Sequence, residues 1–422
     1  MKSRSPWSWI PSLYFAQGLP YVSVMTISVI MYKRMGISNT DIALYTSYLY
    51  LPWVIKPLWS PFIDLFRTKR FWTVWMQFVI GLALAGIALA IPLPSFFQYT
   101  IAVFWLMAFA SATHDIAADG LYMLSLPQHQ QAAFNGVRST FYRIAMIAGQ
   151  GVLVVVAGEL EKTRGIPAAW SLAFFILAGL FLMFFAYHKF MLPVPSADHP
   201  ASRSEGRSVM AEFFRTFALF FKKPGIGAIF AFLLLFRFAE AQLVKLVSPF
   251  LLDARAQGGL GLTTAEVGIA YGTVGVAALL TGGILGGLAI ARFGLKRMIW
   301  IQVLAIHLPD LMFVYLSHVL PENYSIICSA IAVEQFGYGF GFAAYMMFMI
   351  MTAEGEYKTA HYAICTGFMA LGMMIPGMWS GWLQDKIGYA NFFVWVIVST
   401  IPGFIVPALV KIDPEFGKKK II

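Results

Sequence analysis

The chain has 422 residues, of which 59% are hydrophobic and only 12% are charged, and its mean hydropathy is +0.73. This composition excludes a soluble globule and predicts an all-α integral membrane protein. The formal net charge of +10 does not indicate nucleic-acid binding, because the basic residues lie at the ends of apolar segments. Cys328 and Cys365 both fall in apolar segments, so no disulfide framework is indicated.

Apolar segments about as long as a membrane-spanning helix fill most of the chain. The first has no short apolar core followed by a small-residue cleavage site, so we expect it to be a span rather than a removed signal peptide. Hydropathy predicts twelve transmembrane helices, approximately 9–32, 41–63, 71–93, 99–126, 132–158, 167–190, 226–252, 264–290, 298–318, 323–352, 359–383 and 389–410.

These spans divide into two halves of six helices, separated by one long polar segment. We expect an N-terminal half over residues 1–192, a cytoplasmic linker over 193–225 and a C-terminal half over 226–422. Within the linker, phenylalanines recur at helical spacing beside basic residues between Met210 and Lys223, which predicts an amphipathic helix at the membrane surface.

Lys and Arg are concentrated in the loops on one side of the predicted bundle. Arg67–Arg70, Arg292–Arg297 and Lys418–Lys420 all belong to that side. The positive-inside rule therefore predicts that both termini are cytoplasmic.

A weak internal repeat supports two related halves. Asp64–Arg70 follows the second span and Ala291–Arg297 follows the eighth, each as a basic turn. Parallel six-helix halves are typical of the major facilitator architecture. The first turn resembles the cytoplasmic loop motif of that superfamily, which implies a gating loop that includes Asp64, Arg67, Arg70 and Arg292.

Glycine pairs four residues apart predict close contacts between helices in lipid. Examples are Gly282 with Gly286, Gly283 with Gly287, and Gly377 with Gly381.

Ten charged residues lie inside predicted spans, where an ionised side chain costs about 2.5–3.5 kcal/mol even on insertion scales. They are Asp115, Asp119, Glu240, Asp310 and Glu334 against Lys56, Arg138, Arg143, Arg237 and Lys245. Paired structural ions are one interpretation and a functional cavity is the other. We expect Arg237 to pair with Glu240, three residues away, and Asp310 to be structural or close to a span end.

The segment Ala110–Leu126 places His114, Asp115 and Asp119 in an otherwise apolar run. A helix puts both carboxylates on one face, one turn apart. Carboxyl groups whose environment brings their titration near neutral pH can exchange protons, and a histidine can relay them or act as a hydrogen-bonded structural partner. The candidate proton-coupling residues are Asp115, Asp119, Glu240, Glu334 and His114.

Basic side chains in the same helices are candidates to anchor an anionic substrate, and tyrosines offer amphipathic surface that suits sugar rings. The candidate substrate-binding residues are Lys56, Arg138, Tyr142, Arg143, Lys245, Gln17, Tyr48 and Gln335. No further ligands accompany the His114 segment in the sequence, so we expect no metal site.

Several motifs resemble the AmpG-type muropeptide permeases and the related acetyl-coenzyme A transporters of the major facilitator superfamily. They are Phe15–Pro20, Lys56–Pro61, Ser111–Asp119 and Tyr142–Met146, with Glu266–Gly268 and Glu334 in the second half. The resemblance implies a proton-coupled symporter of the bacterial inner membrane that imports anhydromuropeptides and their amino sugars for cell-wall recycling. We expect a monomer in the lipid bilayer, driven by the proton gradient without another cofactor.

Two other functions fit some of the same residues. A carrier of acyl-coenzyme A or another anionic metabolite would use Lys56 and the arginines as phosphate contacts. A membrane acyltransferase would use His114 and Asp119, whose spacing matches a pattern in which an acid orients a general-base histidine.

Overall fold

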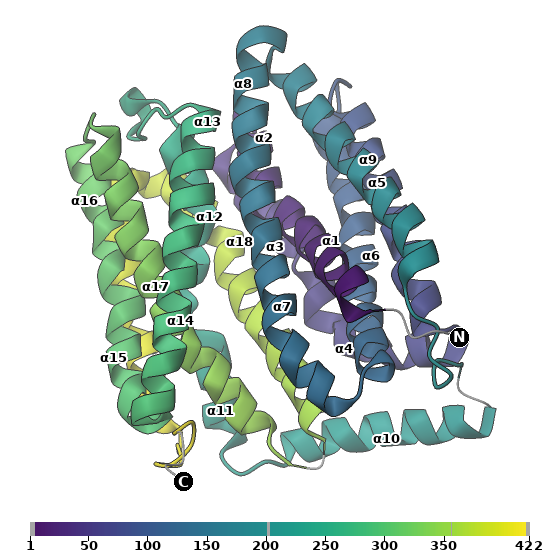
Figure 1. Cartoon of the computed structure of the whole chain (residues 1–422). Coiled ribbons are helices and arrows are strands. Elements are labelled where there is room, and N and C mark those ends of the chain that lie inside the picture. The colour runs from purple at the N-terminus through teal and green to yellow at the C-terminus, as the bar shows by residue number, and fades with distance from the viewer. Residues whose placement is uncertain (1–4, 201–202, 356, 419–422) are drawn as a thin grey trace. The chain divides into compact units, whose positions relative to one another are not determined.

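The computed structural model describes residues 5–200, 203–355 and 357–418, and in these ranges the regular secondary structure is helical (Figure 1). Ten helices within them are long and apolar enough to cross a membrane. Two local breaks account for the difference from the twelve predicted spans.

The second predicted span is built from two short helices. α3 covers Asn39–Tyr48 and α4 covers Leu51–Phe66, and each is shorter than the roughly 20 residues that a complete span needs. The helix stops at Leu49 and restarts just before Pro52, since proline is well tolerated in the first turn of a new helix.

The eleventh and twelfth spans follow one another without a loop. α18 covers Lys358–Val398, but Gly388 within it has φ 76° and ψ 167°, a conformation that favours glycine and separates two helices. α19, Ile401–Leu409, completes the twelfth span. The expected division between residues 383 and 389 therefore corresponds to a sharp turn at Gly388.

The described residues form two compact units. The first combines the segment that ends at Met35 with Ile55–Arg215, and the second combines Gly36–Val54 with the segment that begins at Thr216. The short helix α3 therefore belongs with the second unit, where it packs against α18.

In the first unit, α5 packs against both α6 and α9 (Figure 1). The helices of this unit besides α4 are η1 Pro6–Ser8, α1 Ile10–Val22, η2 Ser23–Ile27, α2 Ser28–Arg34, α5 Lys69–Ala90, α6 Phe96–Ser125, α7 Gln128–Met146, η3 Ile147–Leu153, α8 Val154–Arg164 and α9 Ile166–Met191.

In the second unit, α17 packs against α14, α15 and α16 (Figure 1). The helices of this unit besides α3, α18 and α19 are α11 Ile226–Leu235, α12 Phe238–Leu252, η4 Arg255–Gln257, α13 Thr264–Val267, η5 Gly268–Gly275, α14 Val276–Phe293, α15 Leu295–His307, η6 Leu308–Asp310, α16 Leu311–Val319 and α17 Tyr324–Ala353.

The segment in which an amphipathic helix was expected forms α10, Arg203–Phe221. Near its end, Phe220 is fully buried and its ring lies 5.4 Å from the ring of His361 in α18. Phe214 is 65% exposed. The aromatic residues of α10 therefore divide between an internal contact and an exposed face.

Two of the glycines expected to permit close helix contact do so between α14 and α17. A Cβ atom added at Gly282 would lie 2.1 Å from the carbonyl oxygen of Phe336, and one added at Gly286 would lie 2.4 Å from that of Phe340. Gly287, on the same helix, has no atom within 4 Å of such a position. The first pair therefore sets the helix separation, whereas Gly287 faces away from α17.

We predict that Gly282→Ala lowers the thermal unfolding midpoint of the protein in detergent, because overpacking at a closed contact costs about 1–3 kcal/mol. Gly287→Ala is the matched control and should leave the midpoint unchanged or raise it slightly, since alanine favours helix over glycine. Equal midpoints for the two variants would contradict the assignment of Gly282 to the α14–α17 contact.

Candidate functional site

The two aspartates of α6 each have a basic partner on another helix of the first unit. The Asp115 Oδ2 atom lies 3.9 Å from Nζ of Lys56 on α4. Asp119 Oδ1 lies 2.6 Å from Nη2 of Arg138 on α7, and the hydroxyl of Tyr14 on α1 donates to the same oxygen at 2.9 Å. Because α6 is continuous through this segment, the two ion pairs lie one turn apart on one face.

Arg138 is held between two aromatic rings as well as by Asp119. Its guanidinium carbon lies 4.3 Å from the ring centroids of both Tyr14 and Tyr122. Tyr122 is not among the residues predicted from the sequence. It lies three residues after Asp119 on the same helix, and this spacing could have indicated that the two side chains are neighbours. The rings fix the guanidinium by cation–π contact while leaving its edge free to bind carboxylates.

Both ion pairs of this site are partly accessible. The side chain of Asp119 is 44% exposed and that of Arg138 is 23% exposed, while Lys56 and Asp115 are 24% and 16% exposed. Accessible pairs contribute about 0–1 kcal/mol of net stability, so their partners can be exchanged at little cost. We refer to Lys56, Asp115, Asp119 and Arg138 as the paired-ion site.

His114 does not join the paired-ion site. It is 1% exposed, and Nε2 of its ring lies 3.0 Å from the amide nitrogen of Gln77 on α5. The amide oxygen of Gln77 lies 2.8 Å from Nδ1 of His188 on α9, and Nε2 of His188 lies 2.9 Å from the hydroxyl of Ser12 on α1. This geometry favours a structural role for His114, because the chain of hydrogen bonds ties four helices together.

The acyltransferase interpretation fails on the geometry of α6. His114 and Asp119 are five residues apart, which places them about 140° apart around a helix. The histidine bonds to Gln77, whereas the aspartate bonds to Tyr14 and Arg138. The acid therefore does not orient the histidine as a general base.

The acids of the second unit are arranged differently. Glu240 on α12, Asp310 on η6 and Glu334 on α17 are each 1% exposed, and one carboxylate oxygen from each lies within 4.8 Å of the others. At that separation, two unit charges repel by about 3.5 kcal/mol at an effective dielectric constant near 20. The three groups, which we call the acid cluster, do not all carry charge at once unless a cation compensates them.

The structure limits two sequence-based expectations about this region. For Asp310, a place near a span end is wrong, because the short helix η6 interrupts the ninth span between α15 and α16 and Asp310 is 1% exposed there, while a structural role stays a prediction. Arg237 acts electrostatically on Glu240 as expected, but both carboxylate oxygens of Glu240 lack a hydrogen-bond partner among the described residues.

The backbone explains why the three-residue spacing does not give a hydrogen bond between Arg237 and Glu240. Arg237 is the N-cap of α12, with φ −110° and ψ 22°, so it does not continue the helical geometry that the spacing rule requires. Its guanidinium donates to the hydroxyl of Tyr338 and lies 4.8 Å from the ring centroid of Phe342.

The other predicted binding residues of the first unit lie on α1 and α7. Gln17 is 9% exposed and its amide oxygen has no hydrogen-bond partner among the described residues. Tyr142 is half-buried on α7, and Nε of Arg143 donates to the Ser139 hydroxyl at 3.3 Å. Asp115 and Asp119 both act electrostatically on Tyr142, so Tyr142 lies near the paired-ion site.

The predicted substrate-binding residues of the second unit do not form one group. Lys245 is 2% exposed, donates to the Thr46 hydroxyl at 3.0 Å and lies 5.1 Å from the ring centroid of Tyr50. Tyr48 on α3 is 39% exposed. The amide of Gln335 instead donates to Oε2 of Glu334 at 2.9 Å, which makes it part of the acid cluster's surroundings.

The predicted gating loop is held by the segment that follows α9. The Asp198 carboxylate accepts from the backbone N–H groups of Lys69 at 2.6 Å and Arg70 at 3.0 Å, which caps the amino terminus of α5. Arg67 is exposed over the ring of Phe71. The side chain of Asp64 lies outside the described residues.

In the second copy of this loop, Arg292 is exposed, with its guanidinium carbon 5.4 Å from the ring centroid of Phe293. The two turns therefore share exposed arginines but differ in the groups that hold them.

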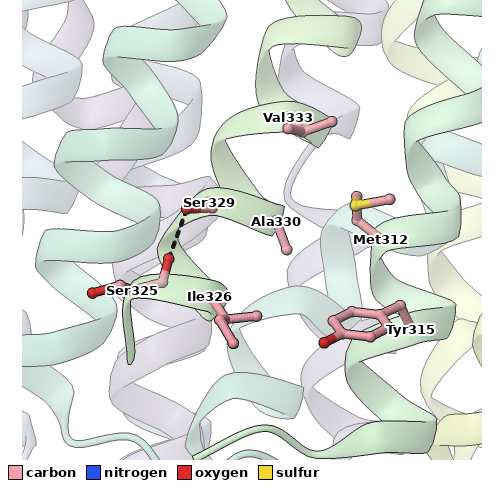
Figure 2. A pocket seen from close by; sticks show the side chains of 7 residues that line it. All are labelled: Met312, Tyr315, Ser325, Ile326, Ser329, Ala330 and Val333. Atoms are coloured by element: carbon pink, nitrogen blue, oxygen red, sulfur yellow. Dashed lines mark hydrogen bonds between the residues drawn. The ribbon is translucent and has the colours of Figure 1, made fainter. Parts of the chain in front are cut away.

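A pocket lies between α16 and α17, and none of the residues that line it is charged (Figure 2). The Ser329 hydroxyl donates a hydrogen bond to the carbonyl oxygen of Ser325. The pocket is lined by Met312, Tyr315, Ser325, Ile326, Ser329, Ala330 and Val333. A surface of this kind fits lipid chains rather than a polar substrate, so we do not place the functional site there.

The comparisons with known proteins cover nearly the whole chain. The profile described as the Major Facilitator Superfamily matches residues 12–377. A putative transporter, AmpG 4 of Rickettsia conorii, is 25% identical over 410 residues, which are 93% of this chain and 94% of that protein. An anhydromuropeptide permease of Escherichia coli is 24% identical over 400 residues, covering 93% of this chain and 77% of the relative.

Solved structures of transporters share the fold. The crystal structure of the nucleoside transporter NupG superposes with a TM-score of 0.70 at 15% identity, covering 96% of this chain and 98% of that one. A transporter of the POT family in complex with a thioalcohol-conjugated peptide gives a TM-score of 0.71 at 12% identity, covering 95% and 96%.

These findings confirm the resemblance indicated by the sequence motifs and the all-α major facilitator fold expected from the sequence. The relatives and fold neighbours named here are transporters rather than enzymes. The chain belongs to the Major Facilitator Superfamily, and it is a membrane transporter.

Proposed function

We propose that this transporter is a proton-coupled symporter that imports peptidoglycan-derived amino sugars and anhydromuropeptides across the bacterial cytoplasmic membrane. The observation that carries the proposal is the paired-ion site, in which Arg138 is aligned by two tyrosine rings and bound to a half-exposed Asp119. The similarity to an anhydromuropeptide permease over 93% of the chain supports the substrate class.

The chemistry of the site suits such a substrate. Muropeptides carry carboxylates, which a guanidinium binds through parallel hydrogen bonds. Tyr14 and Tyr122 flank Arg138 and present amphipathic rings against which sugars can pack. Lys56, paired with Asp115 at 3.9 Å, offers a second positive charge one turn away.

Competition for these cations would link substrate to protons. A substrate carboxylate that binds Arg138 displaces Asp119 from its partner, and loss of a paired cation favours the neutral form of a carboxyl group. Substrate and proton then bind together, as symport requires. Glu240 and Glu334 supply further carboxyl groups in the second unit.

We further propose alternating access, in which the two halves of the protein move relative to one another, as in other transporters of this architecture. Both termini would be cytoplasmic, because the basic loops then lie on the inner side. A carrier of acyl-coenzyme A would use the same cations for phosphates, and substrate competition separates the two functions.

The first prediction concerns energy coupling. Proteoliposomes with wild-type protein should accumulate labelled anhydromuropeptide under an inward proton gradient, whereas Asp119→Asn should exchange substrate across the membrane without accumulating it. Uptake is measured by filtration, with acetyl-coenzyme A as the competing substrate.

Glu159→Gln provides the matched control, because Glu159 is a 56% exposed acid paired with Lys162 three residues away and outside the site. This variant should accumulate substrate like the wild type. Normal accumulation by Asp119→Asn would contradict the proposal. Uptake of labelled acetyl-coenzyme A by the wild type, with no uptake of anhydromuropeptide, would also contradict it.

The second prediction concerns Arg138. Arg138→Lys keeps the charge but loses the planar fork, so the KM for anhydromuropeptide should rise about tenfold or more, as expected from a lost charged hydrogen bond. Lys162→Arg, at the exposed ion pair, should leave KM unchanged. An unchanged KM for Arg138→Lys would remove Arg138 from the binding site.

The third prediction concerns topology. After both native cysteines are replaced by serine, Lys162→Cys should react with a membrane-impermeant maleimide in intact cells, and Lys411→Cys should react only after the membrane is permeabilised. The reverse pattern of labelling would place the termini outside.

A further inference from the structure

The acid cluster of the second unit lacks the partners that structural ions have. Apart from Oε2 of Glu334, the carboxylate oxygens of Glu240, Asp310 and Glu334 have no hydrogen-bond partner among the described residues. Each residue is 1% exposed. Buried polar groups are almost always satisfied, so three unpaired carboxyl groups aimed at one another need a ligand between them.

The packing around the cluster brings Asp310 to the other two acids. A Cβ atom added at Gly337 would lie 2.5 Å from Cγ of Pro309 and 2.2 Å from the carbonyl oxygen of Ala305. Any side chain at position 337 would therefore push the interrupted ninth span away from α17. With glycine there, η6 lies against α17 one turn after Glu334.

The charged and titratable neighbours of the cluster do not neutralise it. Arg237 at the start of α12 acts electrostatically on Glu240. Tyr271 on η5 interacts electrostatically with Glu240, with Glu334 and with Tyr338 on α17. His307, three residues before Asp310, packs beside Phe236 and Phe404. Among the described residues, Arg237 is the cation that acts on the cluster, and it acts on Glu240, so an excess of negative charge is left if all three acids ionise.

Protons neutralise the excess negative charge of the acid cluster better than a metal ion does. Hard divalent cations take six or more oxygen ligands, and the one hydrogen bond that the described residues make to the cluster comes from the amide nitrogen of Gln335, which is a donor and not an oxygen ligand. Two protons shared among three carboxyl groups leave one negative charge, which Arg237 balances. Neutral carboxyl groups can also donate hydrogen bonds to one another, which satisfies the unpaired oxygens.

We propose that Glu240, Asp310 and Glu334 form a proton-binding site that holds two exchangeable protons near neutral pH. This adds a proton site in the second half of the chain to the carboxyl group of Asp119, and it gives Asp310 a role equal to that of the two glutamates. The role of these protons as the coupling ions rests on the proposed symport, whereas their presence does not.

Infrared spectroscopy of the full-length protein in lipid vesicles tests the proposal. The wild type at neutral pH, without substrate, should show the carbonyl stretch of protonated carboxyl groups in a band that shifts on exchange into heavy water. Asp310→Asn should lower this band by about half, because two acids beside one arginine retain a single proton. Asp413→Asn, an exposed acid near the carboxyl terminus, is the matched control and should leave the band unchanged.

Further variants keep the test decisive. If Asp310→Asn fails to fold, Glu240→Gln and Glu334→Gln should each reduce the same band. A band that none of the three variants changes would overturn the proposal. Loss of the band when sodium chloride replaces potassium chloride would also overturn it, because that result would identify a sodium site. A band that responds as expected in a protein without proton-driven uptake would support the proton site and refute the proposed symport.

Discussion

The cost of placing charge inside a membrane is the constraint on which this structure depends. An ionised group in a low-dielectric interior requires a partner, a ligand or loss of its charge. The first unit meets this requirement with opposite charges, since Asp115 and Asp119 have Lys56 and Arg138 beside them. The second unit gathers three acids, only one of which, Glu240, has Arg237 acting on it among the described residues, and the proposed solution there is neutralisation by protons.

This difference between the units suggests a division of tasks. Accessible ion pairs exchange partners easily, which suits the binding and release of a charged substrate. A sealed group of carboxyl groups exchanges protons only when the surrounding helices open, which suits an ion that must not leak. Proton binding in the acid cluster would then be linked to substrate binding through movement of the helices that carry each site, in addition to the competition between substrate and Asp119 for Arg138.

Much of the fold could be predicted from the sequence, because spans of apolar residues are a strong signal and helical spacing places Asp115 and Asp119 correctly on α6. The prediction failed where the backbone departs from a helix. Arg237 lies at a helix break, which turns it toward Tyr338, and η6 carries Asp310 into the interior. The sequence shows Pro309, but the effect of its break depends on Gly337, a contact between residues distant in the chain.

Calorimetric titration of the purified transporter with anhydromuropeptide, in buffers of equal pH but different ionisation enthalpy, tests the linkage of substrate and protons most directly. If substrate and protons bind together, the apparent binding enthalpy should change in proportion to the ionisation enthalpy of the buffer, with the sign of proton uptake by the protein. The same enthalpy in every buffer, across the pH range in which the protein is folded, would mean that substrate binds without protons and would contradict the account.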